Sequence, residues 1–250
     1  MNAKKAIHAW MRWWGYDLVR YRPESHFPAR RSKLLKSFGI STVLDVGANA
    51  GQYGRLLRDV GYRGRIISFE PLSSAYGVLK SVAARDGAWQ ALNIALGEED
   101  GGATINIARN SLSSSILPMT PVHEVASPES KYVGREEVEV RRLDSLIEQL
   151  RPDRQGMLLK LDAQGYEKKI IEGAEKSLAL IDTVEVELSL VPLYEGQALL
   201  SEVCEMLFSR GYQWVSIEPV FTDSATGRLL QIDCMFHRFP RESVAGLPQA

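Results

Sequence analysis

Two carboxylates, Asp45 and Glu70, are spaced as in a nucleotide-binding βαβ unit. Asp45 lies in an apolar run (42–46) that leads into a glycine-containing turn, and Glu70 follows a second apolar run (65–69). Glu70 stands nineteen positions beyond Gly51, where a carboxylate of such units accepts hydrogen bonds from a ribose diol. The spacing favours recognition of a nucleoside. The alternative is that Asp45 only caps a helix and Glu70 is an ordinary acid at the end of a strand.

The turn between the two carboxylates narrows the choice of nucleoside. A dinucleotide site requires Gly-x-Gly-x-x-Gly, but Asn49 and Gln52 occupy the second and third glycine positions. No basic side chain lies in the turn, and an acid before it repels phosphate. S-adenosylmethionine has a nucleoside and cationic groups but no phosphate, so we predict it as the ligand. The candidate cofactor-binding residues are Asp45, Gly47, Asn49, Gly51, Glu70, Pro71 and Ala95.

Two further acids could act on the second substrate. Asp162 comes just after the apolar run 157–161, and Glu187 lies in the run 183–190. Ligands of open parallel sheets bind beyond the carboxyl ends of the strands. Asp162 could take the proton of a hydroxyl during methyl transfer, with Lys160 and Glu187 nearby. A second hypothesis is that Asp162, Glu187 and a third oxygen ligand hold Mg²⁺ against the acceptor oxygen. A third is that Asp162 only forms a salt bridge with Lys160 or caps the next helix.

A long segment rich in serine and proline, residues 110–134, separates two stretches of alternating polarity. Loops of this length in a compact domain are usually functional or disordered, and we expect this one to cover the acceptor site. It contains His123, which has a near-neutral intrinsic pKa and could deprotonate a hydroxyl. The competing interpretation, which we favour, is a solvated surface histidine.

The ordered motifs resemble those of the FkbM-type methyltransferases. The resemblance extends from about Val43 to His237 and rests on DVGANAG at 45–51, FEP at 69–71, LKLDAQGYE at 159–167, and VELS at 186–189 followed by LYEGQ at 193–197. It implies an S-adenosylmethionine-dependent O-methyltransferase that acts on sugar hydroxyls of glycolipids, polysaccharides or natural products. Methylation of protein or RNA, and cofactor binding without catalysis, remain alternatives.

The pattern of elements predicts an α/β fold with a doubly wound, Rossmann-like sheet of about seven strands, the last antiparallel, flanked by helices. We expect strands at 42–46, 65–69, 89–96, 157–161, 183–190, 214–217 and 229–236, helices at 166–180 and 198–210, and exposed-edge strands at 103–108 and 137–140. The expected organisation is a basic, aromatic helical extension (1–38), a methyltransferase domain (39–238) and a tail (239–250).

Composition restricts the partners. A net charge of −1 gives no general reason to expect nucleic acid. Cys204 and Cys234 indicate buried thiols in a reducing compartment, and the absence of a long apolar run makes the cytoplasm the default. Residues 1–22 could rest on the inner face of a membrane, near a lipid-linked sugar. We favour the alternative, a helix that packs on the domain or covers its pocket. The sequence does not determine the oligomeric state.

Overall fold

The computed structural model describes residues 3–150 and 156–240. Its centre is a seven-stranded sheet in the order β3 (Trp89–Leu92), β2 (Arg65–Phe69), β1 (Thr42–Val46), β7 (Met157–Leu161), β8 (Thr183–Ser189), β10 (Leu229–His237) and β9 (Gln213–Thr222). The first five strands are parallel, and β10 runs antiparallel to both β8 and β9. This is the predicted doubly wound sheet with an antiparallel last strand.

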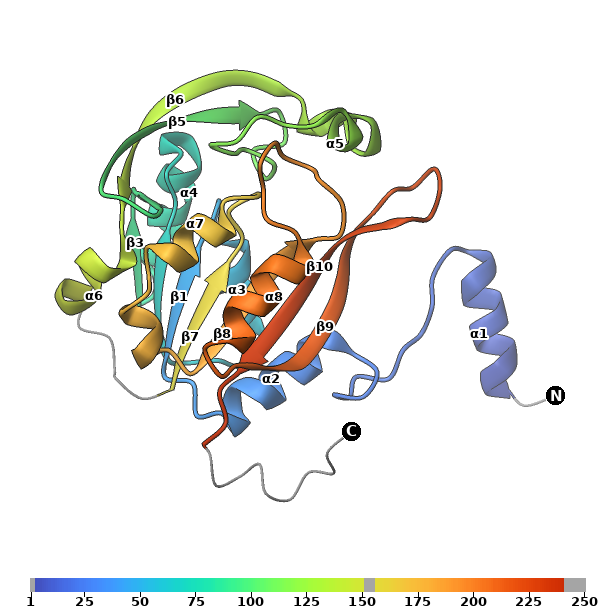
Figure 1. Ribbon diagram of the computed structural model, residues 1–250. Coiled ribbons are helices and arrows are strands. Elements are labelled where there is room, and N and C mark those ends of the chain that lie inside the picture. The colour runs from blue at the N-terminus through green and yellow to red at the C-terminus, as the bar shows by residue number, and fades with distance from the viewer. Residues whose placement is uncertain (1–2, 151–155, 241–250) are drawn as a thin grey trace.

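Helices cover both faces of the sheet (Figure 1). One face packs against α6 (Leu143–Leu150), α7 (Glu167–Glu172) and α8 (Leu200–Phe208). The other packs against α2 (Phe27–Ser37), α3 (Gln52–Asp59) and α4 (Ser73–Ala83). Because both faces are buried, β1 and β7 are buried along their whole length, and their near-continuous apolar runs follow from this position.

A second sheet of three strands lies beyond the carboxyl ends of the central strands (Figure 1). Its order is β4 (Ala95–Leu96), β6 (Tyr132–Arg141) and β5 (Gly101–Ala108), so the two expected edge strands pair with each other. The single strand expected at 89–96 is wrong. Asn93 interrupts it, donating to the carbonyl oxygens of Glu70 and Pro71 at 3.0 and 2.8 Å, and the chain changes sheets there.

Two other boundaries differ from expectation. The helix expected at 166–180 is α7 followed by turns and a 3₁₀ turn (Ser177–Leu180). Gly173 ends α7 and lies close to Gly97, because a Cβ at residue 173 would be 1.9 Å from the Gly97 carbonyl oxygen. The segment 110–134 holds α5 (Pro121–Ala126) and a 3₁₀ turn (Pro128–Ser130), and is therefore not wholly a loop.

The N-terminal extension expected at 1–38 has two different parts. In α2, Leu35 joins the core and the buried Arg31 pairs with buried Glu185 of β8. In contrast, α1 (Ala3–Trp13) stands apart from the sheet and its helices (Figure 1). The expectation that this helix packs on the domain or covers its pocket is wrong, because residues 5–20 are exposed or only half-buried. Most of the expected tail, 239–250, lies outside the described residues.

Within residues 3–150 and 156–240, no helix combines the length and the apolar character needed to cross a membrane. Cys204 and Cys234 are both free and buried, as expected for thiols inside α8 and β10.

Candidate functional site

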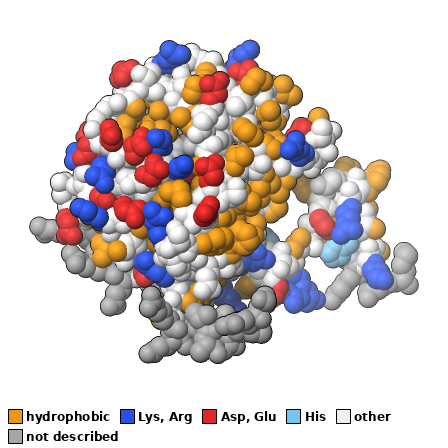
Figure 2. Space-filling view, viewed as in Figure 1, with side chains coloured by type: hydrophobic (Ala, Val, Ile, Leu, Met, Phe, Trp, Pro, Cys, Tyr) orange, Lys and Arg blue, Asp and Glu red, His pale blue; other side chains and the backbone are white. Residues whose placement is uncertain are grey.

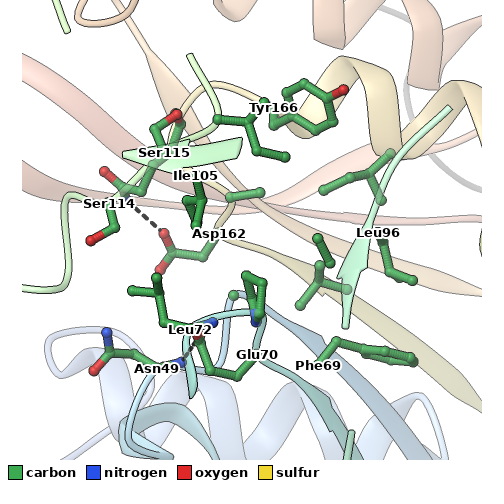
Figure 3. Close-up of a pocket in the computed structure, with 18 of the residues that line it drawn as sticks. Asn49, Phe69, Glu70, Leu72, Leu96, Ile105, Ser114, Ser115, Asp162 and Tyr166 are labelled. Carbon is green, nitrogen blue, oxygen red and sulfur yellow. Dashed lines mark hydrogen bonds between the residues drawn. The ribbon is translucent and has the colours of Figure 1, made fainter. Parts of the chain in front are cut away.

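A cavity of about 250 Å³ lies at the carboxyl ends of β1, β2 and β7, between the central sheet and the small one (Figure 3). Its walls come from the two turns after β1 and β2, the turn after β7, the small sheet and the segment 111–116. The position is the one at which open α/β sheets bind ligands. The serine-rich segment expected to cover a substrate therefore does line the cavity, through Ser111, Leu112, Ser114, Ser115 and Ile116.

The turn after β1 is shaped by left-handed backbone conformations. Gly47 has φ +77°, and a Cβ there would lie 1.8 Å from the carbonyl oxygen of Asp162, so only glycine lets the two strand ends approach. Asn49 has φ +45°, its side-chain oxygen accepts the Ala50 N–H at 2.8 Å, and its amide donates to Ser111 Oγ at 3.2 Å. Asparagine tolerates this conformation better than most residues. Both residues line the cavity.

Glu70 joins the two turns on one cavity wall. Its Oε2 accepts the Asn49 N–H at 2.7 Å and its Oε1 accepts the Leu72 N–H at 2.8 Å (Figure 3). Burial raises the pKa of Glu70 to about 7, although both backbone donors oppose the rise. Each carboxylate oxygen uses one lone pair in these two hydrogen bonds and keeps a second lone pair as a possible acceptor. Pro71 and Ala95 line the same cavity.

Asp45 and Gly51 take positions outside the cavity wall. Asp45 is buried in β1 and accepts a 2.8 Å hydrogen bond from Ser68, whose Oγ accepts the Trp89 indole N–H at 3.0 Å. Burial raises the pKa of Asp45 to about 6. Gly51 begins α3 at φ +83°, packed against Leu79 and Trp89. Neither Asp45 nor Gly51 lines the cavity. Both belong to the structure that holds the turn after β1 in place.

Asp162 and Glu187 meet across Gln164, a residue that sequence reasoning did not select. The Gln164 side-chain nitrogen donates to Asp162 Oδ1 at 2.8 Å and to Glu187 Oε2 at 2.9 Å. Its oxygen accepts the Tyr194 hydroxyl at 2.6 Å, and its backbone is left-handed, with φ +53°. Asp162, Gln164 and Glu187 all line the cavity. The sequence signal for Gln164 is its position between an acid at the end of a strand, Asp162, and a glycine, Gly165.

Buried charged side chains on three neighbouring strands lie next to Asp162 and Glu187. Asp45, Lys160 and Glu185 are paired neighbours across β1, β7 and β8. Lys160 Nζ lies 3.7 Å from Asp162 Oδ2 and donates to Asp233 Oδ1 at 3.2 Å. The two neighbouring carboxylates raise the pKa of Lys160 against the opposing effect of its burial, so it remains a cation. Lys160 is therefore beneath the site, not in the cavity wall.

Glu187 has a different electrostatic environment from Asp162. Burial raises the pKa of Glu187 well above its usual value, and the charge of Asp162 raises it further. Its Oε2 also accepts the Gln231 amide at 2.8 Å. Asp162, by contrast, exposes 37% of its side chain and lies beside Lys160. Burial thus favours the neutral form of Glu187.

His123 is not brought to this cavity. It is buried in α5, packs edge-on against Tyr194 with ring centroids 5.1 Å apart, and lies 3.1 Å from Ser130 Oγ through Nε2. Burial lowers its pKa to about 4. The solvated surface histidine that the sequence favoured is wrong because α5 folds this residue inward. Its position does not support the general-base hypothesis either, since it does not line the cavity.

The proposed Mg²⁺ ligands do not fit a metal ion in their present arrangement. Asp162 and Glu187 share one amide NH₂ group, which occupies the space between their oxygens. Among the residues that the structure describes, no group of three or more His, Cys, Asp or Glu side chains is arranged to hold a metal. Mg²⁺ is usually held by one or two carboxylates together with several waters, and here an N–H donor lies where the ion would have to bridge the two carboxylates.

Solved structures with related architecture include an rRNA methylase from Streptococcus thermophilus (12% identity, 89% of this chain and 100% of that one, TM-score 0.46). Others are a putative S-adenosylmethionine-dependent methyltransferase from Listeria monocytogenes (10%, 84% and 96%, 0.47) and a putative tRNA methyltransferase from Streptococcus pneumoniae solved with S-adenosylmethionine (13%, 84% and 74%, 0.44). Similarities at this level do not identify an acceptor.

No curated protein sequence is similar enough to this chain to count as a relative. The family model described as "Methyltransferase FkbM domain" matches residues 45–214. That range begins at Asp45 and includes Glu70, Asp162, Gln164 and Glu187, the acids and the amide around the cavity. With well over half of its length matched, the chain belongs to the FkbM methyltransferase family.

Proposed function

We propose that this protein transfers the methyl group of S-adenosylmethionine to a hydroxyl of a sugar, carried by a glycolipid, a polysaccharide or a glycosylated natural product. The observation that carries the proposal is the pair Asp162 and Glu187, held by one amide on the wall of the cavity. A hydroxyl is a poor nucleophile until its proton is removed, so a positioned carboxylate suits this acceptor. The sugar follows from the family resemblance.

The residues near β1 and β2 fit the donor. The Glu70 carboxylate is fixed by two backbone N–H groups and keeps acceptor capacity for a ribose diol. Pro71 and Ala95 provide apolar surface beside it for a flat base. When bound, S-adenosylmethionine supplies an electrophilic methyl group on a sulfonium. Among the described residues that line the cavity there is no lysine or arginine, which suits a donor without a phosphate.

The residues near β7 and β8 fit the acceptor. Asp162 is the general base in this proposal, because it lines the cavity, lies 3.7 Å from Lys160 Nζ, and has its Oδ1 oriented by Gln164. Burial raises the pKa of Glu187 and so favours its neutral form, which can donate a hydrogen bond to the sugar or accept one from it. Lys160 and Gln164 are positioning residues. Since methyl transfer is an in-line displacement, holding the hydroxyl toward the donor is most of what the protein must do.

The test begins with calorimetric titration of S-adenosylhomocysteine and, separately, NADH. We expect micromolar binding of the first and none of the second. Labelled S-adenosylmethionine is then offered with glycolipid sugars, with protein and with RNA. Label in the glycan fraction supports the proposal. Product that is sensitive to RNase or protease replaces the sugar with RNA or protein, and donor binding without any turnover indicates a non-catalytic binder.

The variant Asp162→Asn separates donor binding from catalysis. It should bind S-adenosylhomocysteine normally but lose at least 100-fold in turnover, in the range that a general base contributes. Asp59→Asn is the matched control, because Asp59 is an exposed carboxylate of α3 away from the cavity. Full activity of Asp162→Asn would remove Asp162 from the reaction.

A further inference from the structure

Helix α1 separates apolar and basic side chains onto opposite faces. Ile7 and Trp10, together with Trp14 in the turn directly after the helix, follow one another at intervals of three and four residues, which places them on one side. Lys5, His8 and Arg12 have the same intervals, displaced by two residues, which places them on the other side. Trp10 and Trp14 contact edge to face, with ring centroids 6.3 Å apart, and Trp13 and Trp14 do so at 5.3 Å.

This apolar face has no partner within the described part of the chain. Trp10, Trp13 and Trp14 are 60%, 79% and 59% exposed, and Ile7 is 51% exposed. The apolar residues that follow the helix, Leu18, Val19 and Tyr21, are exposed as well. Figure 2 shows hydrophobic and basic side chains together on this separate lobe. Exposed apolar clusters of this kind mark binding surfaces, and a tryptophan cluster is a large part of such a surface.

The charge of the same segment indicates what covers it. Residues 5–22 contain Lys5, Arg12, Arg20 and Arg22 against a single acid, Asp17. Asp17 is itself held by Arg12 at 3.0 Å. We propose that residues 5–22 lie in the interface of an anionic lipid bilayer, with the tryptophans among the acyl-chain boundary and the basic side chains at the headgroups. This proposal does not depend on methyl transfer.

The segregation of the two faces favours lipid over nucleic acid. Proteins that bind RNA present aromatic side chains for stacking within a positively charged groove. In α1 the aromatic and basic groups are on opposite sides instead, the arrangement of helices that lie flat in a membrane interface. Tryptophan prefers that interface because its ring is apolar and its N–H is polar.

The experiment is sedimentation of the full-length protein with lipid vesicles. We expect binding to vesicles of phosphatidylcholine with about 30% phosphatidylglycerol, weak binding to phosphatidylcholine alone, and loss of binding in about 0.5 M salt. Trp10→Ala/Trp14→Ala should weaken binding at least tenfold. Lys5→Gln/Arg12→Gln should weaken it about tenfold on anionic vesicles, because each basic side chain gains from the surface potential.

Trp214→Ala is the matched control, since Trp214 is also an exposed tryptophan (47%) but lies on β9. It should bind vesicles as the unaltered protein does. The α1 variants should keep their unfolding temperature and their affinity for S-adenosylhomocysteine. The proposal would be overturned if the protein bound neutral and anionic vesicles equally, or bound no vesicle at all. It would also be overturned if Trp10→Ala/Trp14→Ala lost binding to RNA, or lost a dimer that the unaltered protein forms. The last two would assign α1 to RNA or to a second copy of the chain.

Discussion

Replacing Glu70 by glutamine tests the donor site most directly. The carboxylate accepts the N–H groups of Asn49 and Leu72, one on each oxygen. A glutamine keeps the shape, but its NH₂ group must face one of these two donors. One hydrogen bond is therefore lost at every pH, which costs about 1–3 kcal/mol of unfolding free energy.

The pH dependence isolates the charge of Glu70. Burial raises its pKa from 4.5 to about 7 in the folded protein, and one pKa unit corresponds to about 1.36 kcal/mol, so the total is roughly 3 kcal/mol. A raised pKa means that the folded state binds the proton more tightly. The resulting stability is fully present below pH 4.5 and is lost as the pH rises through 7. Glutamine does not titrate, so the advantage of the unaltered protein over Glu70→Gln should shrink by about this amount between these pH values.

Donor binding should change in the opposite direction with pH. A ribose diol donates to the ionised carboxylate, and hydrogen bonds to charged groups contribute about 1.5–3 kcal/mol, equivalent to roughly tenfold to 100-fold in affinity. At pH 8 the variant should therefore bind S-adenosylhomocysteine at least tenfold more weakly. The affinity of the unaltered protein should fall as the pH drops below about 7, while that of the variant should stay flat.

Urea unfolding at several pH values and calorimetric titration provide these measurements. Asp223→Asn is the control, because Asp223 also accepts a backbone N–H, from Ala225 at 3.0 Å, but lies outside the cavity wall. It should leave donor affinity unchanged. If folded Glu70→Gln binds S-adenosylhomocysteine as tightly as the unaltered protein at pH 8, Glu70 does not hold the ribose.

Three further predictions concern the metal, the turn after β1 and the buried ion pair. Chelator should leave turnover unchanged, because the Gln164 amide lies between Asp162 and Glu187; loss of activity that Mg²⁺ restores would show that the amide moves aside for an ion. Gly47→Ala should lose about 2–5 kcal/mol of unfolding free energy, because residue 47 has a positive φ and the new Cβ would clash with Asp162. The control is Gly61→Ala, where φ is +88° but no atom lies within 4 Å of the new Cβ. It should lose only about 1–2 kcal/mol. Equal losses in urea unfolding would refute the close approach. Arg31→Met should lose about 3–5 kcal/mol of unfolding free energy, because Glu185 remains buried without its paired arginine. The double variant Arg31→Met/Glu185→Leu should recover part of this loss. If it recovers none, packing and not charge dominates the stability of this pair.

Local patterns were sufficient for the central sheet. Runs such as 42–46 and 157–161 are apolar because each strand is buried on both faces, and that requirement is visible without knowing which strands pair. The turn at 47–51 and Glu70 were likewise identified from residue type and spacing, because a βαβ unit places them at one sheet edge whatever the rest of the chain does. The carboxyl-end positions of Asp162 and Glu187 follow from the same rule.

Long-range contacts decided what the sequence could not. The pleat of β1 turns Asp45 toward Ser68, beneath the cavity, although its spacing suits the donor. The fold of 110–134 buries His123 against Tyr194, a residue 71 positions further along. Gln164 joins two acids only because a left-handed backbone conformation and the Tyr194 hydroxyl hold its amide there.

Sequence alone therefore determined the class of fold, the family and the edge of the sheet that carries the site, because these depend on periodicity and on short motifs within single βα units. Tertiary structure decided which side chains face the cavity and which remain beneath it. The physical reason is that side-chain direction at a strand end depends on contacts with strands and loops far away in the chain. The exposure of α1 belongs to the second group, since a helix shows its apolar face in the sequence but not whether anything covers it.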